Sequence, residues 1–176
     1  MSRVYMVDIY HHPIAQKYLR RSGLAHAVAC AYNAFALAER AGVDADAACK
    51  AAFLHDIGHY TWYQNGSWDY EQYRRNDIHA IKGAERAHKL LIRLGEDPEK
   101  AKEISLAVLF HTDSFLPDPS MKKDKLQEVV AAADEADEEP GGAHHYRKIT
   151  DDSAVKSLTA LDTMLTARCT QTAASS

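Results

Sequence analysis

The chain has 176 residues and a formal net charge of −4, from 21 Lys and Arg against 25 Asp and Glu. This length suits one domain, and we expect a single domain over residues 1–176, with a motif-bearing core at about 24–168 and a frayed tail at 169–176. The acidic balance gives no overall positive field, which disfavours extended nucleic acid and anionic membranes as partners. Ten histidines stand out in an otherwise ordinary composition, because histidine titrates near neutral pH and is the commonest metal ligand.

The three cysteines, Cys30, Cys49 and Cys169, are widely spaced and form no C-x-x-C pair. This pattern indicates neither a disulfide framework nor a thiolate zinc site. The first twenty residues lack the apolar stretch of a signal peptide, and no run of apolar residues is long enough to span a membrane. We therefore expect a cytoplasmic protein.

In chain order, the first strong helix prediction is LAHAVACAYNAFALAERA, residues 24–41, with Gly42 placed to end it. A second helix is expected from Asp44 or Asp46 to Gly58. Residues 59–76 hold six aromatic residues without a regular period and predict a long loop, or a loop with a short helix. Amphipathic spacing, caps and proline positions predict further helices over 78–94, 98–110, 121–138 and 153–168. No useful strand-like alternation occurs, so the expected fold is all-α, with about six or seven helices.

Four histidines and two carboxylates occupy inward-facing or edge positions on five of these predicted helices. They are His26, His55, Asp56, His79, His111 and Asp134. One buried histidine is more often a hydrogen-bonded core residue than a ligand, but six such groups would each need a separate partner. A shared divalent metal satisfies all of them. Nitrogen and carboxylate ligands without thiolates suit Fe, Mn, Co, Ni or Zn, with Mg suited to a carboxylate-rich position.

The order of these six residues resembles the HD superfamily of metal-dependent phosphohydrolases. The local strings match as well: the segment ending in AAFLHDIGH is similar to the family's AALLHDIGK-type segment, HAIKGAE to its third-histidine helix, and KLQEVVAAAD to the helix that ends in the ligand aspartate. The resemblance covers residues from about 24 to 137. It implies a helical-bundle HD domain.

Carried over residue by residue, the resemblance implies two metal sites that share Asp56. His26, His55, Asp56 and Asp134 would hold one ion, and His79 and His111 are the extra pair of two-metal members. Such a site would hydrolyse a phosphoester or phosphoanhydride through a metal-activated hydroxide, with the cations neutralising the phosphate oxygens. The family's usual lysine, three residues after the aspartate, is His59 here. One interpretation places His59 in the catalytic set beside Asp56, where it donates a proton or a hydrogen bond to the phosphate or to the leaving group. The other makes it a loop residue at the rim of the site.

Within the superfamily, His111-Thr112 and Glu139-Pro140-Gly141 partly resemble the bacterial HD-type symmetrical diadenosine tetraphosphatases. Gly142 stands where that group favours arginine, and Gly23 where it has a basic residue; Arg20 and Arg21 lie close by instead. A nucleotide or another small phosphate ester is therefore the expected substrate class.

The aromatic segment 60–73 lies between two ligand motifs, where it either closes over a substrate or forms a small core of its own. The candidate substrate contacts, for base or phosphate, are Arg20, Arg21, Trp62, Trp68, Arg74, Arg75 and Lys82. Asp137, one turn after Asp134, is either a partner of the ligands or a helix-end charge.

The other five histidines, His11, His12, His88, His144 and His145, are expected at the surface. Two other functions stay open at this stage. An HD-fold diiron oxygenase would use the same ligand types, and HDIGH resembles one such group, although Phe115 stands where those enzymes have lysine. A non-enzymatic nucleotide sensor would keep the metal as a structural element. The sequence leaves the oligomeric state open.

Overall fold

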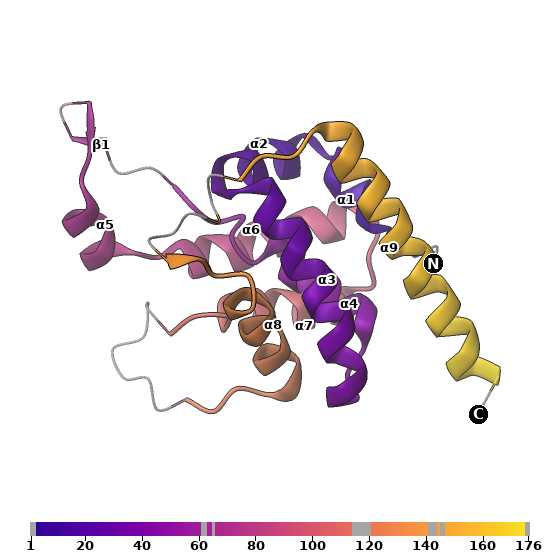
Figure 1. The fold of residues 1–176 in the computed structure, drawn as a ribbon. Coiled ribbons are helices and arrows are strands. Elements are labelled where there is room, and N and C mark those ends of the chain that lie inside the picture. Colours follow the sequence, from indigo (N-terminus) through magenta and orange to yellow (C-terminus); the bar gives the residue numbers. More distant parts are fainter. Residues whose placement is uncertain are drawn as a thin grey trace.

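The computed structural model describes residues 3–60, 63–64, 66–113, 121–140, 144 and 147–174. Within these ranges the fold is all-α, as predicted. Its nine α-helices are α1 (Met6–His11), α2 (Pro13–Ser22), α3 (Leu24–Ala41), α4 (Ala45–Leu54), α5 (Tyr70–Asn76), α6 (His79–Leu94), α7 (Pro98–Leu109), α8 (Lys125–Glu135) and α9 (Asp151–Ala174). Figure 1 shows their arrangement. No described helix has the length and apolar character needed to cross a membrane.

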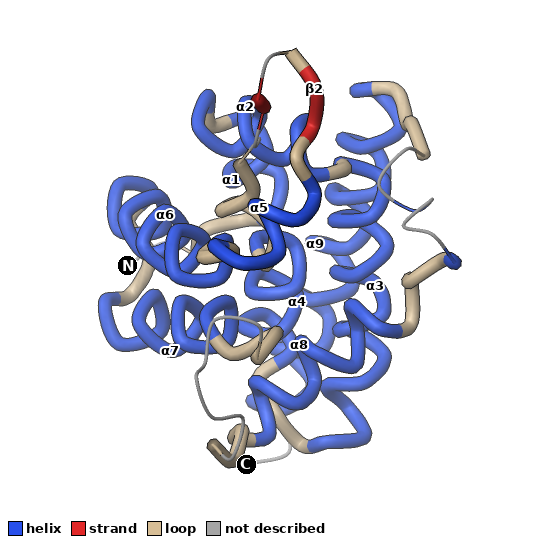
Figure 2. The backbone as a smooth tube through the Cα atoms, turned by 90° about the vertical axis from the view of Figure 1, so that its left-hand side faces the viewer, coloured by secondary structure: helices blue, strands red, loops and turns tan. Residues whose placement is uncertain are grey.

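Helix α4 is the centre of the bundle. All ten of its residues are buried, and it packs against α3, α7 and α8, which surround it in Figure 2. Its sequence ADAACKAAFL is rich in alanine, and small side chains let neighbouring helix backbones approach closely. Asp44 begins the helix by accepting a hydrogen bond from the backbone N–H of Asp46. The buried position of α4 matters for function because its C-terminal end leads directly into His55 and Asp56.

Charged groups also lie within this core. Lys50 is fully buried on α4, and its ammonium group pairs with Asp46, one turn earlier, and with Glu96 from the turn after α6. Asp46 also pairs with Lys100 at 2.8 Å and with Arg3 at 2.8 Å. This network links the N-terminal segment, α4 and the start of α7, and the burial of its charges makes each one depend on its partners.

The N-terminal helices α1 and α2 were not predicted. Helix α1 has only six residues, and Pro13 then begins α2, so neither offers a long periodic pattern. Helix α9 packs along α1, and its Asp162 accepts hydrogen bonds from the first backbone N–H groups of α1, at 2.8 Å from Met6 and 3.1 Å from Val7. α9 continues to Ala174, beyond the predicted end at 168. A long-range contact thus completes a helix too short to stand alone.

The aromatic segment contains a short helix, α5, which was one of its two predicted forms. It also holds a minimal antiparallel hairpin, β1 (Tyr63–Gln64) and β2 (Ser67–Trp68), where no strand was expected. Helix α5 follows, and none of its residues is buried. In Figure 1, β1 and α5 project from the side of the bundle opposite α9. With α1 and α2, α5 raises the count from the predicted six or seven helices to nine among the described residues.

Candidate metal centre

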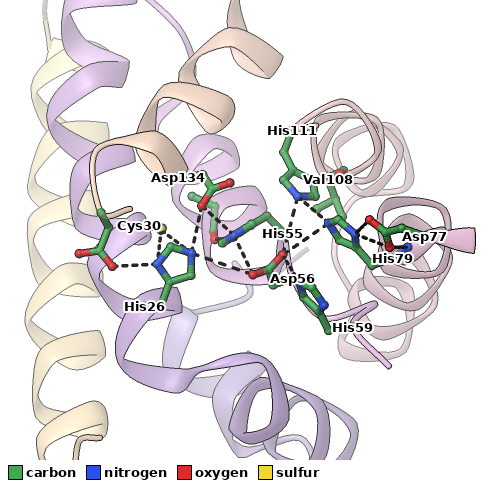
Figure 3. A network of polar contacts seen from close by, with 12 residues as sticks. His26, Cys30, His55, Asp56, His59, Asp77, His79, Val108, His111 and Asp134 are labelled. Atoms are coloured by element: carbon green, nitrogen blue, oxygen red, sulfur yellow. Dashed lines mark hydrogen bonds and ion pairs between the residues drawn. The ribbon is translucent and has the colours of Figure 1, made fainter. Parts of the chain in front are cut away.

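Five helices deliver the six predicted ligands to one place (Figure 3). His26 lies in the first turn of α3, His55 and Asp56 follow α4 directly, His79 begins α6, His111 follows α7, and Asp134 is near the end of α8. Five of the six, all except Asp134, are at most 7 % exposed. Helix ends from distant parts of the sequence therefore meet at the C-terminal end of α4.

The carboxylate of Asp56 stands between two groups of imidazoles. Its Oδ2 lies 3.3 Å from Nε2 of His55 and 4.0 Å from Nε2 of His26. Its Oδ1 lies 3.7 Å from the Nε2 atoms of both His79 and His111. Among the predicted ligands, each oxygen thus faces a separate pair of rings.

Asp134 belongs to the first of these groups. Its Oδ1 lies 3.0 Å from Nε2 of His26 and 3.4 Å from Nε2 of His55. Its side chain is 20 % exposed, whereas that of Asp56 is 7 % exposed. The cluster is therefore closed around Asp56 and more open beside Asp134.

Each of the four rings is held from behind through Nδ1 by a group that can only accept a hydrogen bond. These pairs are His26 with Asp137 (2.8 Å), His55 with the Ala52 carbonyl (2.7 Å), His79 with Asp77 (2.7 Å) and His111 with the Val108 carbonyl (2.6 Å). The acceptor assigns the proton to Nδ1, so that Nε2 is the atom turned toward the carboxylates. Asp137 is thus a partner of His26, one of its two predicted roles.

The four Nε2 atoms need a positive centre between them. Nε2 of His79 lies 3.1 Å from Nε2 of His111, and two lone pairs repel at that distance unless a proton or cation lies between them. Nε2 of His55 is buried and makes no hydrogen bond with any described residue. Nitrogen and carboxylate donors in this arrangement fit a divalent transition metal.

Burial and neighbouring charged groups together shift the pKa values in the cluster. Burial, together with His55 nearby, lowers the pKa of His111 to about 3, so its ring is neutral at physiological pH and can act as a ligand. Burial opposes charge on Asp56 and Asp134, but the adjacent imidazoles outweigh it and hold both pKa values well below the usual range. Burial also acts to lower the pKa of His26, yet its hydrogen bond with Asp134 raises the pKa to about 10. A metal ion would therefore displace a proton at His26.

Gly58 determines how closely the His55–His59 turn approaches α6. A Cβ atom on Gly58 would lie 1.8 Å from the carbonyl oxygen of His79 and 2.3 Å from the backbone nitrogen of Gly83. Only glycine permits this contact. The close approach brings the ring of His59 onto that of His79, with centroids 4.4 Å apart and planes within 7°.

His59 itself lies against the cluster, since its Nε2 is 3.1 Å from Oδ1 of Asp56, and its side chain is 22 % exposed. Burial acts to lower the pKa of His59, but the charge of Asp56 outweighs it and raises the pKa.

Sequence reasoning missed three neighbours of the ligands. His144 was expected at the surface and is buried, because its ring packs 4.5 Å from that of His26; of the other histidines in that group, His11 and His88 are exposed and His12 is partly exposed, while His145 lies outside the described residues. Asp77, the partner of His79, stands two residues before it, a spacing typical of a helix-start turn. Cys30, one turn after His26, has its Sγ 3.5 Å from Nδ1 of that ring.

The predicted substrate contacts differ in their partners and in their exposure to solvent. Lys82 places its ammonium group 4.8 Å from the centroid of Tyr60, the residue after His59. Arg20 pairs with Asp151 and Arg74 with Glu71, all exposed. Arg21 lies 5.7 Å from the ring of Tyr18, and Arg75 is exposed. Trp62 lies outside the described residues, and of Trp68 only the backbone, in β2, is described.

Comparison with known proteins agrees with this arrangement. A family model described as "HD domain" matches residues 23–139, a range that includes every predicted ligand. The chain is 62 % identical over 165 residues to the "Putative phosphohydrolase YueE" of Bacillus subtilis (strain 168), and the match covers 94 % of each chain. No solved structure matches the chain significantly.

Proposed function

Because this chain belongs to the HD-domain family, we propose that it is a divalent-metal-dependent phosphohydrolase of a small, nucleotide-like phosphoester or phosphoanhydride. The observation that carries the proposal is the position of Asp56, whose two oxygens face two different imidazole pairs. The similarity to a bacterial protein named as a phosphohydrolase supports the reaction class.

We assign the ligands according to which oxygen of Asp56 each imidazole faces. His26, His55, Asp56 and Asp134 would hold one ion, and His79 and His111, together with Asp56, would hold a second. When bound, divalent ions lower the pKa of water and neutralise charge on phosphate oxygens, the two things that phosphate hydrolysis needs at neutral pH. The identity of the ions is open among Fe, Mn, Co, Ni, Zn and Mg.

The protein's own groups orient this chemistry. Asp137 and Asp77 hold the rings of His26 and His79, at 2.8 and 2.7 Å, so that each Nε2 keeps its direction. His59 lies partly exposed beside Asp56, where its Nε2 can donate to a phosphate oxygen or to the leaving group. Asp56 and His59 are accordingly our catalytic pair.

A nucleotide-like substrate fits the rim next to His59. The rings of Tyr60 and Tyr73 lie there, 6.1 Å apart, and offer surface for a base, while Lys82 beside Tyr60 offers charge for phosphate. Arg20, Arg21, Arg74 and Trp62 remain further candidates, and a cytoplasmic location remains part of the proposal.

The test is metal analysis of untagged protein, followed by a hydrolysis screen of nucleotides and aryl phosphates with Mn, Fe, Co, Ni, Zn and Mg. We expect phosphate release that a chelator abolishes and added metal restores. H55A and D56A should lose both metal and activity, whereas H88A, which changes an exposed histidine on α6, should keep them. Metal-loaded protein without phosphate release, or H55A and D56A that behave like the wild type, would refute the proposal; substrate-dependent oxygen uptake would point to a diiron oxygenase instead.

A further inference from the structure

Five imidazoles surround Asp56, and four of them are backed by pure acceptors. The fifth, His59, is backed by a hydroxyl: its Nδ1 lies 3.2 Å from the phenol oxygen of Tyr73. A carbonyl or a carboxylate can only accept a hydrogen bond, but a phenol can also donate one. The group behind each ring therefore separates His59 from the four ligands.

The contact at Nε2, on the other side of the His59 ring, indicates the direction of the hydrogen bond between Tyr73 and Nδ1. Nε2 of His59 lies 3.1 Å from Oδ1 of Asp56, within hydrogen-bonding distance of an anionic oxygen. An unprotonated Nε2 would place a lone pair against that oxygen, so this contact needs a proton or a cation between the two atoms, and a hydroxyl behind the ring that can donate to Nδ1 favours the proton on Nε2. In a neutral ring Nδ1 is then the acceptor, and the hydroxyl of Tyr73 is its donor.

Tyr73 lies in α5, in the projecting part of the fold. No residue of α5 is fully buried, but Tyr73 is partly buried where it meets His59. Its ring lies 6.1 Å from that of His59 and is inclined to it by 20°. His59 is thus held on three sides: by Asp56, by the stacked ring of His79 and by Tyr73.

We propose that Tyr73 is a positioning residue for His59: its hydroxyl donates to Nδ1, keeps the proton on Nε2, and so makes His59 a hydrogen-bond donor at the active site and not a metal ligand. This inference rests on the proposed phosphohydrolase function for its effect on rate. It assigns the Oδ1 side of Asp56 two histidine ligands, His79 and His111 at 3.7 Å, although His59 lies closer to that oxygen, at 3.1 Å.

The first experiment observes the tautomer directly and does not depend on activity. Long-range ¹H–¹⁵N spectra of the metal-loaded protein, prepared with diamagnetic Zn, would be compared with those of H59Q to assign the His59 ring. We expect Nε2 protonated and Nδ1 unprotonated in the wild type, and a loss of this single tautomer in Y73F. A wild-type ring protonated at Nδ1, or Y73F with an unchanged ring, would overturn the proposal.

The second experiment is a double-mutant cycle on the hydrolysis rate. Y73F should lower kcat by about fivefold, the worth of one hydrogen bond, with little change in KM and unchanged metal content. In the H59Q background the same substitution should have no further effect. Y32F is the matched control, because it also removes one phenol hydrogen bond, 2.7 Å to the Ser157 carbonyl, and should leave kcat unchanged.

The two proposals fail in different ways. If wild-type protein releases no phosphate from any substrate, the proposed function falls, and the ring spectra alone decide the role of Tyr73. If the wild type is active but Y73F lowers kcat equally with and without His59, Tyr73 acts by another route and this inference is wrong.

Discussion

Replacing Gly58 with alanine is expected to damage both the fold and the metal centre. Gly58 does not have a positive φ, so alanine suits the backbone, and the objection to it is purely steric. The added Cβ would lie 1.8 Å from the carbonyl oxygen of His79, and that oxygen would have to retreat by about 1.2 Å to reach even a 3.0 Å contact. Because the obstacle is the backbone of α6, no side-chain rotation can relieve it.

The magnitude follows from this displacement. Forcing a methyl group into a packed contact costs about 2 to 3 kcal/mol, which lowers the Tm of a chain of this length by about 5 to 10 °C. The residue that must move is itself a predicted ligand. A shift of about 1 Å at His79 should therefore reduce kcat by about 100-fold.

Thermal unfolding, metal content and phosphate release of G58A measure these effects together. G42A is the control: Gly42 has φ 67° and no atom within 4 Å of an added Cβ, so it should lose about 1 kcal/mol from its left-handed backbone alone and keep wild-type kcat. If G58A keeps the Tm, the metal and the kcat of the wild type, then the close approach of the turn to α6 is not real.

Three further substitutions test the surroundings of the site and the core. D77N should weaken metal binding by about 10- to 100-fold in chelator competition, because the amide holds the His79 ring less firmly; affinity equal to the wild type would exclude this orienting role. K50A should lower the free energy of unfolding in urea by about 3 to 5 kcal/mol, since it leaves Glu96 buried without its lysine partner and takes from Asp46 one of its three cations. Burial acts to raise the pKa of Asp46, but Lys50 and Lys100 outweigh burial and lower the pKa below 3.8. The ionised form of Asp46 therefore stabilises the folded state. The difference in the free energy of unfolding between the wild type and D46N should be full above pH 3.8 and disappear as the pH falls below it. Urea titrations between pH 3 and 7 would show a constant difference if this reasoning is wrong.

The sequence sufficed to predict the helices that carry long periodic patterns. The prediction for 24–41 agrees with α3, Leu24–Ala41, because Gly42 adopts the left-handed conformation expected at its end. The prediction for 121–138 is too long, as α8 covers Lys125–Glu135. Asp124 and Gln127 form a capping box there, and this D-x-x-Q signal marks the start of the helix later than its apolar periodicity does.

Other features depend on contacts that no local pattern encodes. Helix α1 is completed by Asp162, which lies 156 residues after Met6. His144 is buried because its ring packs against that of His26, yet in the sequence it is one of two adjacent polar residues before a basic segment. Local propensity and periodicity describe a residue's near neighbours, and these residues take their places from distant ones.

The chemistry of the centre also depends on which nitrogen of each imidazole carries the proton. The ligand pattern predicts which side chains meet around Asp56, but the proton on each ring is decided by the group behind it. Two of those groups, the carbonyls of Ala52 and Val108, are backbone atoms that any residue at those positions would supply. The hydroxyl of Tyr73 is different, because phenylalanine would fit the same space and remove the donor. Under this proposal, two proteins with identical ligand residues differ in the tautomer of the fifth histidine, His59, when one carries a hydroxyl at position 73 and the other does not.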